Sequence, residues 1–113
     1  LRPGIDIVLD AIGIEEHLSN ADLVITGEGR LDSQSIAGKT PVGVARRAKK
    51  FNLPVVAIAG SLATDAELVT EHGIDALFSC VPGAISLDQA MQEAFINLRN
   101  TSQNIARISQ LLD

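Results

Sequence analysis

The stretch that decides the fold is ADLVITGEGRLDSQSIAGKTPVGVARRAKKFNLPVVAIAGS, residues 21–61. Its segment DLVIT, residues 22–26, is short, apolar and rich in β-branched residues, which predicts a buried strand. Thr40 and Pro41 then suit the N-cap and the first position of a helix over about 41–51. A second apolar run, LPVVAIAG at 53–60, predicts another buried strand. Two buried strands joined by a helix indicate parallel pairing with a right-handed crossover.

The flanking sequence extends this pattern on both sides. Before it, Pro3 and the spacing of the apolar residues at 5, 8, 9 and 12 predict a helix. After it, Thr64 and Glu67 form a capping-box pattern for a short helix that stops at Gly73. The run DALFSC at 75–80 then predicts a third strand.

The C-terminal third predicts one more helical region. Ser86 and Gln89 form a second capping box. One apolar helical face follows it to the C-terminus and is expected to be core; it comprises Leu87, Ala90, Met91, Ala94, Phe95, Leu98, Ile105, Ile108 and Leu112. The order α-β-α-β-α-β-α predicts a single α/β unit over residues 1–113, part of a doubly wound three-layer α/β/α fold with a parallel sheet of about three strands. Because complete folds of this kind usually have about five or six strands, the chain is expected to be the closing part of a larger enzyme.

Composition narrows the class of protein. The 113 residues suffice for one domain, and 46% of them are apolar. A net charge of −5 argues against nucleic-acid binding, and the basic cluster Arg46, Arg47, Lys49 and Lys50 is expected to be the solvated face of a helix. No apolar run approaches the ~18 residues of a membrane span. Cys80, the single cysteine, is expected to be a small buried hydrophobe, and its being alone favours a reducing, cytoplasmic compartment.

Residues 24–41, VITGEGRLDSQSIAGKTP, nearly match two nucleotide-binding motifs. Gly27-Glu28-Gly29 opens like a dinucleotide-binding loop, but Asp32 stands at the third glycine position. Gly38-Lys39-Thr40 closes like a Walker A loop, but Ser33 stands where the first glycine belongs. The eight residues between Gly29 and Gly38 would not form the same nest of N–H groups as the four of a Walker A loop. From these near-matches alone, either a binding loop or an ordinary glycine-rich turn is possible.

The segment nevertheless collects polar side chains beyond the end of a predicted strand, where ligands bind in open α/β sheets. Glu28 and Asp32 are hard oxygen ligands that suit Mg²⁺. Arg30 and Lys39 suit a phosphate or a carboxylate. The other candidates in this segment offer backbone approach, hydroxyls or an amide, and are Thr26, Gly27, Gly29, Ser33, Gln34, Ser35, Gly38 and Thr40. Ser61, expected just beyond the second strand, is a further ligand-binding candidate.

Three motifs carry a resemblance to a known family. They are T-G-E-G-R-x-D-x-Q from Thr26, G-K-x-P-x-G-V-A from Gly38 and P-V-x-A-x-A-G-S from Pro54. Together with the flanking sequence they resemble the glycerate kinase family of the bacterial two-domain type over essentially the whole chain. The resemblance implies ATP-dependent, Mg²⁺-assisted phosphorylation of D-glycerate in a cleft between two α/β domains. Family members are several times longer, so this chain would be their C-terminal part, with the remainder of the parent chain as its partner.

The resemblance maps the family's signature loop onto Thr26, Gly27, Glu28, Gly29, Arg30, Asp32, Gln34, Gly38 and Lys39. Within it, we expect Glu28 and Asp32 to hold the metal or act as general base. Arg30 and Lys39 are expected to bind phosphate or the glycerate carboxylate, with Lys39 among the catalytic residues. The 113 residues alone are expected to be inactive.

Two alternatives stay open. The first is a non-catalytic, flavodoxin-like module that binds a nucleotide or another ligand. The second is half of a nicotinamide-dependent dehydrogenase, which is disfavoured because AIAGS, at the end of the second strand, offers no carboxylate for a ribose. Open strand edges would also permit a homodimer.

Overall fold

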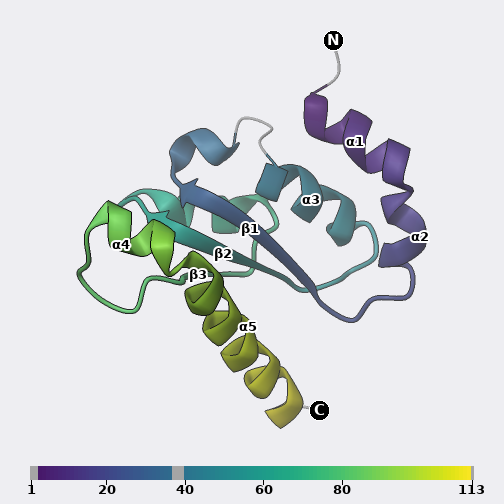
Figure 1. Cartoon of the computed structure of the whole chain (residues 1–113). Coiled ribbons are helices and arrows are strands. Elements are labelled where there is room, and N and C mark those ends of the chain that lie inside the picture. Colours follow the sequence, from purple (N-terminus) through teal and green to yellow (C-terminus); the bar gives the residue numbers. More distant parts are fainter. Residues whose placement is uncertain (1–2, 37–39, 113) are drawn as a thin grey trace.

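The computed structural model describes residues 3–36 and 40–112 (Figure 1). Its helices and strands are α1 Gly4–Ile12, α2 Ile14–Leu18, β1 Val24–Leu31, the 3₁₀ helix η1 Ser33–Ile36, α3 Thr40–Lys49, β2 Val55–Leu62, the 3₁₀ helix η2 Ala66–His72, β3 Ala76–Ser79, α4 Leu87–Gln92 and α5 Ala94–Leu111. The predicted order of helices and strands is confirmed. In the described ranges no helix is both long and apolar enough to cross a membrane.

The three strands form one parallel sheet in the order β1-β2-β3, so β2 lies at its centre. The register aligns Val24 with Val55 on the first pair of strands, and Val56 with Ala76 on the second. Helices cover both faces, with α1, α2 and α3 on one side and α5 on the other (Figure 1). The α/β prediction with about three parallel strands is therefore confirmed.

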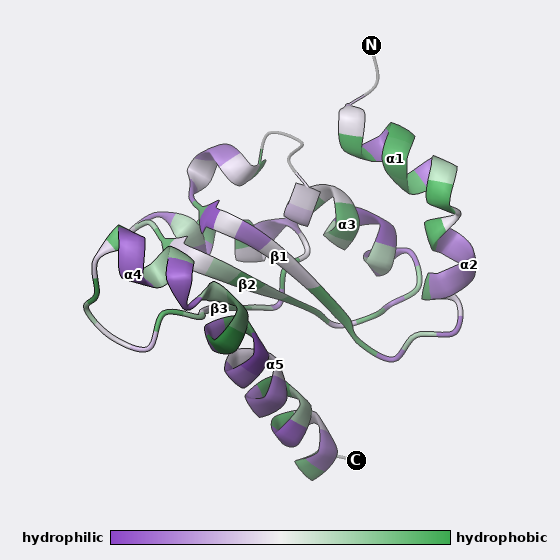
Figure 2. Cartoon of the chain, in the orientation of Figure 1, coloured by the Kyte–Doolittle hydropathy of each residue, from purple (hydrophilic) through white to green (hydrophobic). Residues whose placement is uncertain are grey.

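The α3 side holds the main hydrophobic core. Helix α3 presents Val42, Ala45 and Ala48 to the sheet residues Val55 and Ala57, and all five side chains are buried. Small alanines allow the helix to lie close to the strands, and the branched residues fill the space between them. Figure 2 shows apolar residues along the N-terminal part of β1 and along β2, and polar residues toward the arrowhead of β1.

Arg47 corrects one prediction, because it does not lie on a solvated helix face. Its side chain is buried, and the guanidinium donates to Asp10 Oδ1 at 2.8 Å and to Glu15 Oε1 at 2.7 Å, and to Asp6 Oδ1 at 3.2 Å. The hydrogen bond from Arg47 holds the pKa of Glu15 below its ordinary value of 4.5. One cation thus ties α1 and α2 to α3.

Both long strands extend further than the sequence predicts. β1 continues to Leu31 rather than ending at Thr26, and β2 continues to Leu62, so Ser61 lies within the strand and not after it. The extended parts pair with each other, with Arg30 opposite Ser61 and Leu31 opposite Leu62. A Cβ on Gly60 would lie 2.9 Å from the carbonyl oxygen of Gly29, so the close approach of the two strands requires glycine at position 60.

The capping-box predictions have mixed outcomes. Ser86 Oγ accepts the N–H of Gln89 at 3.1 Å and starts α4 as predicted. The box at Thr64 is wrong, since Asp65 is the N-cap and the helix that follows is 3₁₀. Gly73 ends that helix with φ 98°, as predicted from its place after the last helical residue. Thr40 is the first residue of α3 and not the one before it.

The C-terminal apolar face is largely exposed, which contradicts the prediction that it is core. It is divided at Glu93 between α4 and α5, and only Ile105 among its large side chains is buried. Met91 is 69% exposed, and Leu87 and Phe95 are exposed by 75% and 77%. The helices are present as predicted, but nothing in residues 3–36 and 40–112 covers most of this apolar face.

Candidate functional site

The candidate residues of β1 lie where the strand approaches its C-terminal end. Along the strand, the side chains of Thr26, Glu28 and Arg30 alternate with Gly27 and Gly29, so the polar residues and the glycines lie on opposite faces. Thr26 is buried, Glu28 half-buried and Arg30 exposed. The polar series therefore becomes more open to solvent toward the end of the strand, where ligands of α/β sheets bind.

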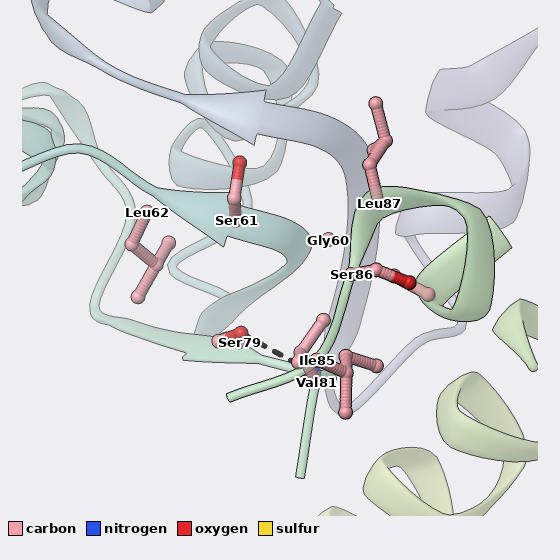
Figure 3. Close-up of a pocket in the computed structure, with 9 residues that line it drawn as sticks. Gly60, Ser61, Leu62, Ser79, Val81, Ile85, Ser86 and Leu87 are labelled. Atoms are coloured by element: carbon pink, nitrogen blue, oxygen red, sulfur yellow. Dashed lines mark hydrogen bonds between the residues drawn. The ribbon is translucent and has the colours of Figure 1, made fainter. Parts of the chain in front are cut away.

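β2 supplies Ser61 to the same place. The strand register pairs Arg30 with Ser61, so the two side chains are neighbours on one face of the sheet. Figure 3 shows the Ser61 hydroxyl pointing away from the end of β2, with Leu62 on the opposite side. The structure thus brings together two candidates that are 31 positions apart in the sequence.

Asp32 organises the turn that follows β1. Its Oδ1 accepts the N–H of Gln34 at 2.9 Å, and its own N–H donates to Ser35 Oγ at 3.2 Å. Its Oδ2 lies 3.6 Å from Arg30 Nε. The carboxylate is held from two directions beside an exposed cation, a geometry that fixes its position at the strand end.

Two of the candidate residues predicted from the sequence, Ser35 and Ser33, make hydrogen bonds that hold the turn after β1 in place. Ser35 is buried and its hydroxyl accepts the Asp32 N–H, which places it inside the turn. Ser33 donates its N–H to Asp65 Oδ1 at 3.2 Å, which joins the turn to the start of η2. Gln34 is exposed. Gly38 and Lys39 lie outside the described residues.

A cation would find only part of its coordination shell in this region. Glu28 Oε1 accepts the N–H of Gly29 at 3.0 Å, and Asp32 is engaged as described. Across the described ranges, no group of three or more His, Cys, Asp or Glu side chains is placed to hold a metal ion. Two carboxylates nevertheless suit Mg²⁺, which binds through one or two of them together with substrate phosphates and water.

Two cavities adjoin the strand ends. One, of about 440 Å³, lies between the end of β2 and the segment leading into α4, and includes Gly60, Ser61, Ser79 and Ser86 (Figure 3). The other, of about 480 Å³, lies between the glycines of β1 and helix α5. Cys80 lines it and is half-buried, so it is not the fully buried hydrophobe that the sequence suggests.

Sequence reasoning missed the contribution of α4 and α5 to this region. Ala90, Met91, Ala94 and Asn97 line a further cavity against Gly29 and Gly60. Their helical spacing is the same signal that a core stripe gives, so the pattern alone could not separate the two roles. The one sequence signal is Asn97, a polar residue that follows the apolar residues 94–96. A polar residue at a position that becomes buried usually has a hydrogen-bond partner, so Asn97 could have indicated a binding role instead of a core role.

Comparisons with known proteins show the family to which the chain belongs. The sequence model of the glycerate kinase family matches residues 1–110. The chain is 54% identical over 106 residues to a glycerate kinase of Bacillus subtilis strain 168, covering 94% of this chain and 28% of that protein. It is 53% identical over 106 residues to a glycerate 2-kinase of Escherichia coli K12, again covering 94% and 28%.

A solved structure gives the same result in three dimensions. The crystal structure of a Salmonella typhimurium LT2 protein described as glycerate kinase 2 aligns with a TM-score of 0.72 and 49% identity. The alignment covers 98% of this chain and 28% of that one. The chain therefore spans little more than a quarter of the length of the proteins that it matches.

Proposed function

The chain belongs to the glycerate kinase family, and we propose that the protein carrying it transfers the γ-phosphoryl group of ATP to a hydroxyl of D-glycerate. The observation that carries the proposal is the family match over residues 1–110, with the polar series Glu28, Arg30 and Asp32 at the end of a parallel strand. Phosphoryl transfer depends chiefly on positioning and on neutralising charge, and this strand end offers charged groups of both signs.

The geometry supports a division of roles among the charged residues. Arg30 is exposed beside Asp32, and with Lys39 it would bind the phosphates or the glycerate carboxylate. Asp32, held by the Gln34 amide and by Arg30, is suited to hold Mg²⁺, whose chemistry is to neutralise the phosphate oxygens. Glu28, which accepts one neighbouring N–H, is suited to take the proton of the attacking hydroxyl while the bond from γ-phosphorus to its bridging oxygen breaks.

The remaining binding roles follow from where each residue lies. Ser61 would contact the substrate from the neighbouring strand, since it stands beside Arg30. Gly27 and Gly29 allow a ligand to approach the backbone of β1. We retain Thr26, Gln34, Ser35 and Gly38 in the binding set. Thr26 and Ser35 are buried, so they would act by fixing the strand and the turn.

We propose that residues 1–113 are the C-terminal part of a longer two-domain kinase, which supplies the other wall of the active site. The share of 28% of the relatives' length supports this, as do the exposed apolar side chains of α4 and α5. The single cysteine supports a cytoplasmic location. A homodimer through the open edge of the sheet, a different surface from that of α4 and α5, is an alternative.

The test measures D-glycerate-dependent ADP formation by the longer kinase. Asp32→Ala and Lys39→Ala should each lower kcat/KM by at least about tenfold, equivalent to about 1.4 kcal/mol of lost transition-state stabilisation. Lys50→Ala, which removes an exposed cation beyond α3, is the matched control and should keep the rate. The 113-residue chain alone should show no turnover.

Kinetics unchanged by both substitutions would remove these residues from the site. Absence of any glycerate-dependent ADP from the longer protein would favour the second candidate, a flavodoxin-like module that binds a nucleotide or another ligand without chemistry. That candidate predicts saturable ligand binding by the 113-residue chain with no phosphorylated product.

A further inference from the structure

A cavity of about 340 Å³ lies between the glycines near the ends of β1 and β2 and the side of α4 and α5 that faces them. We call it the α5 cleft and define it by Gly29, Gly60, Ala90, Met91, Ala94 and Asn97. We propose that the α5 cleft binds the purine base of the nucleoside triphosphate. This inference rests on the proposed kinase function and identifies where that function's phosphate donor is recognised.

The floor of the α5 cleft has no side chains at its two glycines. A Cβ built on Gly29 would meet no other atom within 4 Å, so the space above this residue is open. Gly29 does not have a positive φ, so its backbone conformation does not require glycine. The absence of a side chain is therefore explained by the room it leaves, and a flat ring can lie against the bare strand backbone.

The walls of the α5 cleft are apolar and adaptable. Ala90 and Ala94 contribute small side chains from α4 and α5, and the exposed Met91 contributes a flexible thioether. Methionine sulfur makes favourable contacts with aromatic rings. Small-molecule sites are mostly apolar cavities of about 300–1,000 Å³ with a few polar groups, and the α5 cleft falls within this range.

Asn97 supplies a polar group, unpaired among the described residues, to a cavity that Ser61 also lines. It is only 7% exposed, and within the described residues its Nδ2 is the one buried side-chain nitrogen or oxygen without a hydrogen-bond partner. A buried donor left unpaired costs stability, so such a group calls for a partner that binding would provide. Purine rings carry nitrogen acceptors in the plane of the ring, and an amide N–H₂ in the wall of the cleft is a suitable donor to one of them.

The position of the α5 cleft also fits a nucleotide. Gly29 is adjacent in β1 to both Glu28 and Arg30, whose side chains lie on the other face of the strand. A base in the cleft would therefore leave its phosphates to cross the end of the sheet toward Arg30 and Ser61, which are register partners. Ligands of open α/β sheets occupy this crevice beyond the strand ends.

The test separates the base from the phosphates. The ¹⁵N-labelled 113-residue chain is titrated with adenosine and, separately, with inorganic tripolyphosphate. Adenosine should shift the backbone amides of Gly29 and Gly60 and the side-chain amide of Asn97. Tripolyphosphate, which is expected at Arg30 and Ser61 beside the two glycines, should leave the Asn97 side-chain amide in place, so Asn97 is the signal that separates the base from the phosphates.

Two substitutions and a control make the assignment specific. Gly29→Val places a side chain in the α5 cleft and should weaken adenosine binding by at least about tenfold. Gly4→Val, at another glycine whose Cβ would meet nothing within 4 Å, should leave binding unchanged. Asn97→Leu removes the unpaired donor at similar size, so it should weaken adenosine binding while stability is kept or increased.

The outcomes distinguish this proposal from the proposed function. If adenosine shifts none of the three signals, or if Gly29→Val and Asn97→Leu both bind it as the unsubstituted chain does, the base-binding proposal is overturned. Normal glycerate phosphorylation by a longer kinase carrying Gly29→Val, with an unchanged KM for ATP, would also overturn it while the kinase function stands. Adenosine binding in the α5 cleft of a protein that forms no glycerate-dependent ADP would support the site and reject the kinase.

Discussion

The two faces of the sheet differ in how completely this chain covers them. On the α3 side, Leu31, Val42, Val55, Val69 and Ile74 are at most 1% exposed. On the α5 side, Leu87, Met91 and Phe95 are each more than two thirds exposed, although their sequence pattern is just as apolar. The same helical periodicity thus occurs on a buried face and on an exposed face, so an apolar stripe does not by itself show whether another part of the chain packs against it.

The polar groups follow the same division. On the α3 side, Arg47 is buried together with hydrogen bonds to three carboxylates. On the α5 side, Asn97 is buried and its amide nitrogen has no hydrogen-bond partner among the described residues. Buried polar groups are normally satisfied, so within residues 3–36 and 40–112 the first arrangement is complete and the second is not.

The largest expected loss of stability compares a buried side chain on the α3 side with an exposed one on the α5 side. Ile74→Ala should lower the free energy of unfolding by about 2–5 kcal/mol, because it leaves a cavity in a fully buried site. Phe95→Ala removes a larger side chain from the α5 side, yet should change the stability of the 113-residue chain by no more than about 0.5 kcal/mol. Urea unfolding of both variants measures the difference. Equal losses would show that the two faces are packed alike.

The next largest effects on stability are expected at two glycines, Gly43 on the α3 side and Gly29 on the α5 side. A Cβ on Gly43 would lie 2.7 Å from Ile5 Cγ2, so Gly43→Ala should push α1 away from α3 and cost about 1–3 kcal/mol. Gly29→Ala meets nothing within 4 Å and should stabilise the chain by up to about 1 kcal/mol, because it restricts the unfolded state. Thermal or urea unfolding gives both values. A stabilising Gly43→Ala would mean that α1 is not held against α3.

The smallest expected change in stability concerns the carboxylates that surround Arg47. Because the pKa of Glu15 is lowered in the folded chain, its contribution is fully present above its ordinary value of 4.5 and is lost as pH falls below it. Glu15→Gln should therefore be less stable than the unsubstituted chain near neutral pH, and the gap should close as the solution becomes acidic. Glu16→Gln, in the same helix, is the control for removing a carboxylate. A gap that is constant with pH would contradict the role of Arg47.

Much of the fold could be predicted from local signals. The strand positions, the Gly73 stop and the Ser86 cap depend on residues close together in the sequence, and the structure has all of them. The extension of β1 past Thr26 could not be predicted, because it depends on pairing with the distant segment 59–62 of β2. The glycine-rich motif looked like a loop because glycine has low strand propensity in isolation.

The candidate site divides in the same way. The sequence names the charged residues Glu28, Arg30 and Asp32, since charged groups after a buried strand are a local pattern. It could not show that Ser61 stands beside Arg30, that Ser35 is turned inward, or that α4 and α5 form a cleft over the glycines. Each of these depends on elements brought together by packing.

The sequence by itself determined the order of helices and strands, the parallel sheet and the family, because periodicity, capping residues and motifs are properties of short segments. Only the tertiary structure decided which apolar face is buried and which polar groups are paired. Arg46 and Arg47 are adjacent in α3, yet only Arg47 is buried, since α1 and α2 bring their carboxylates to its side of the helix. Burial and pairing depend on what lies across from a residue, and no local pattern contains that information.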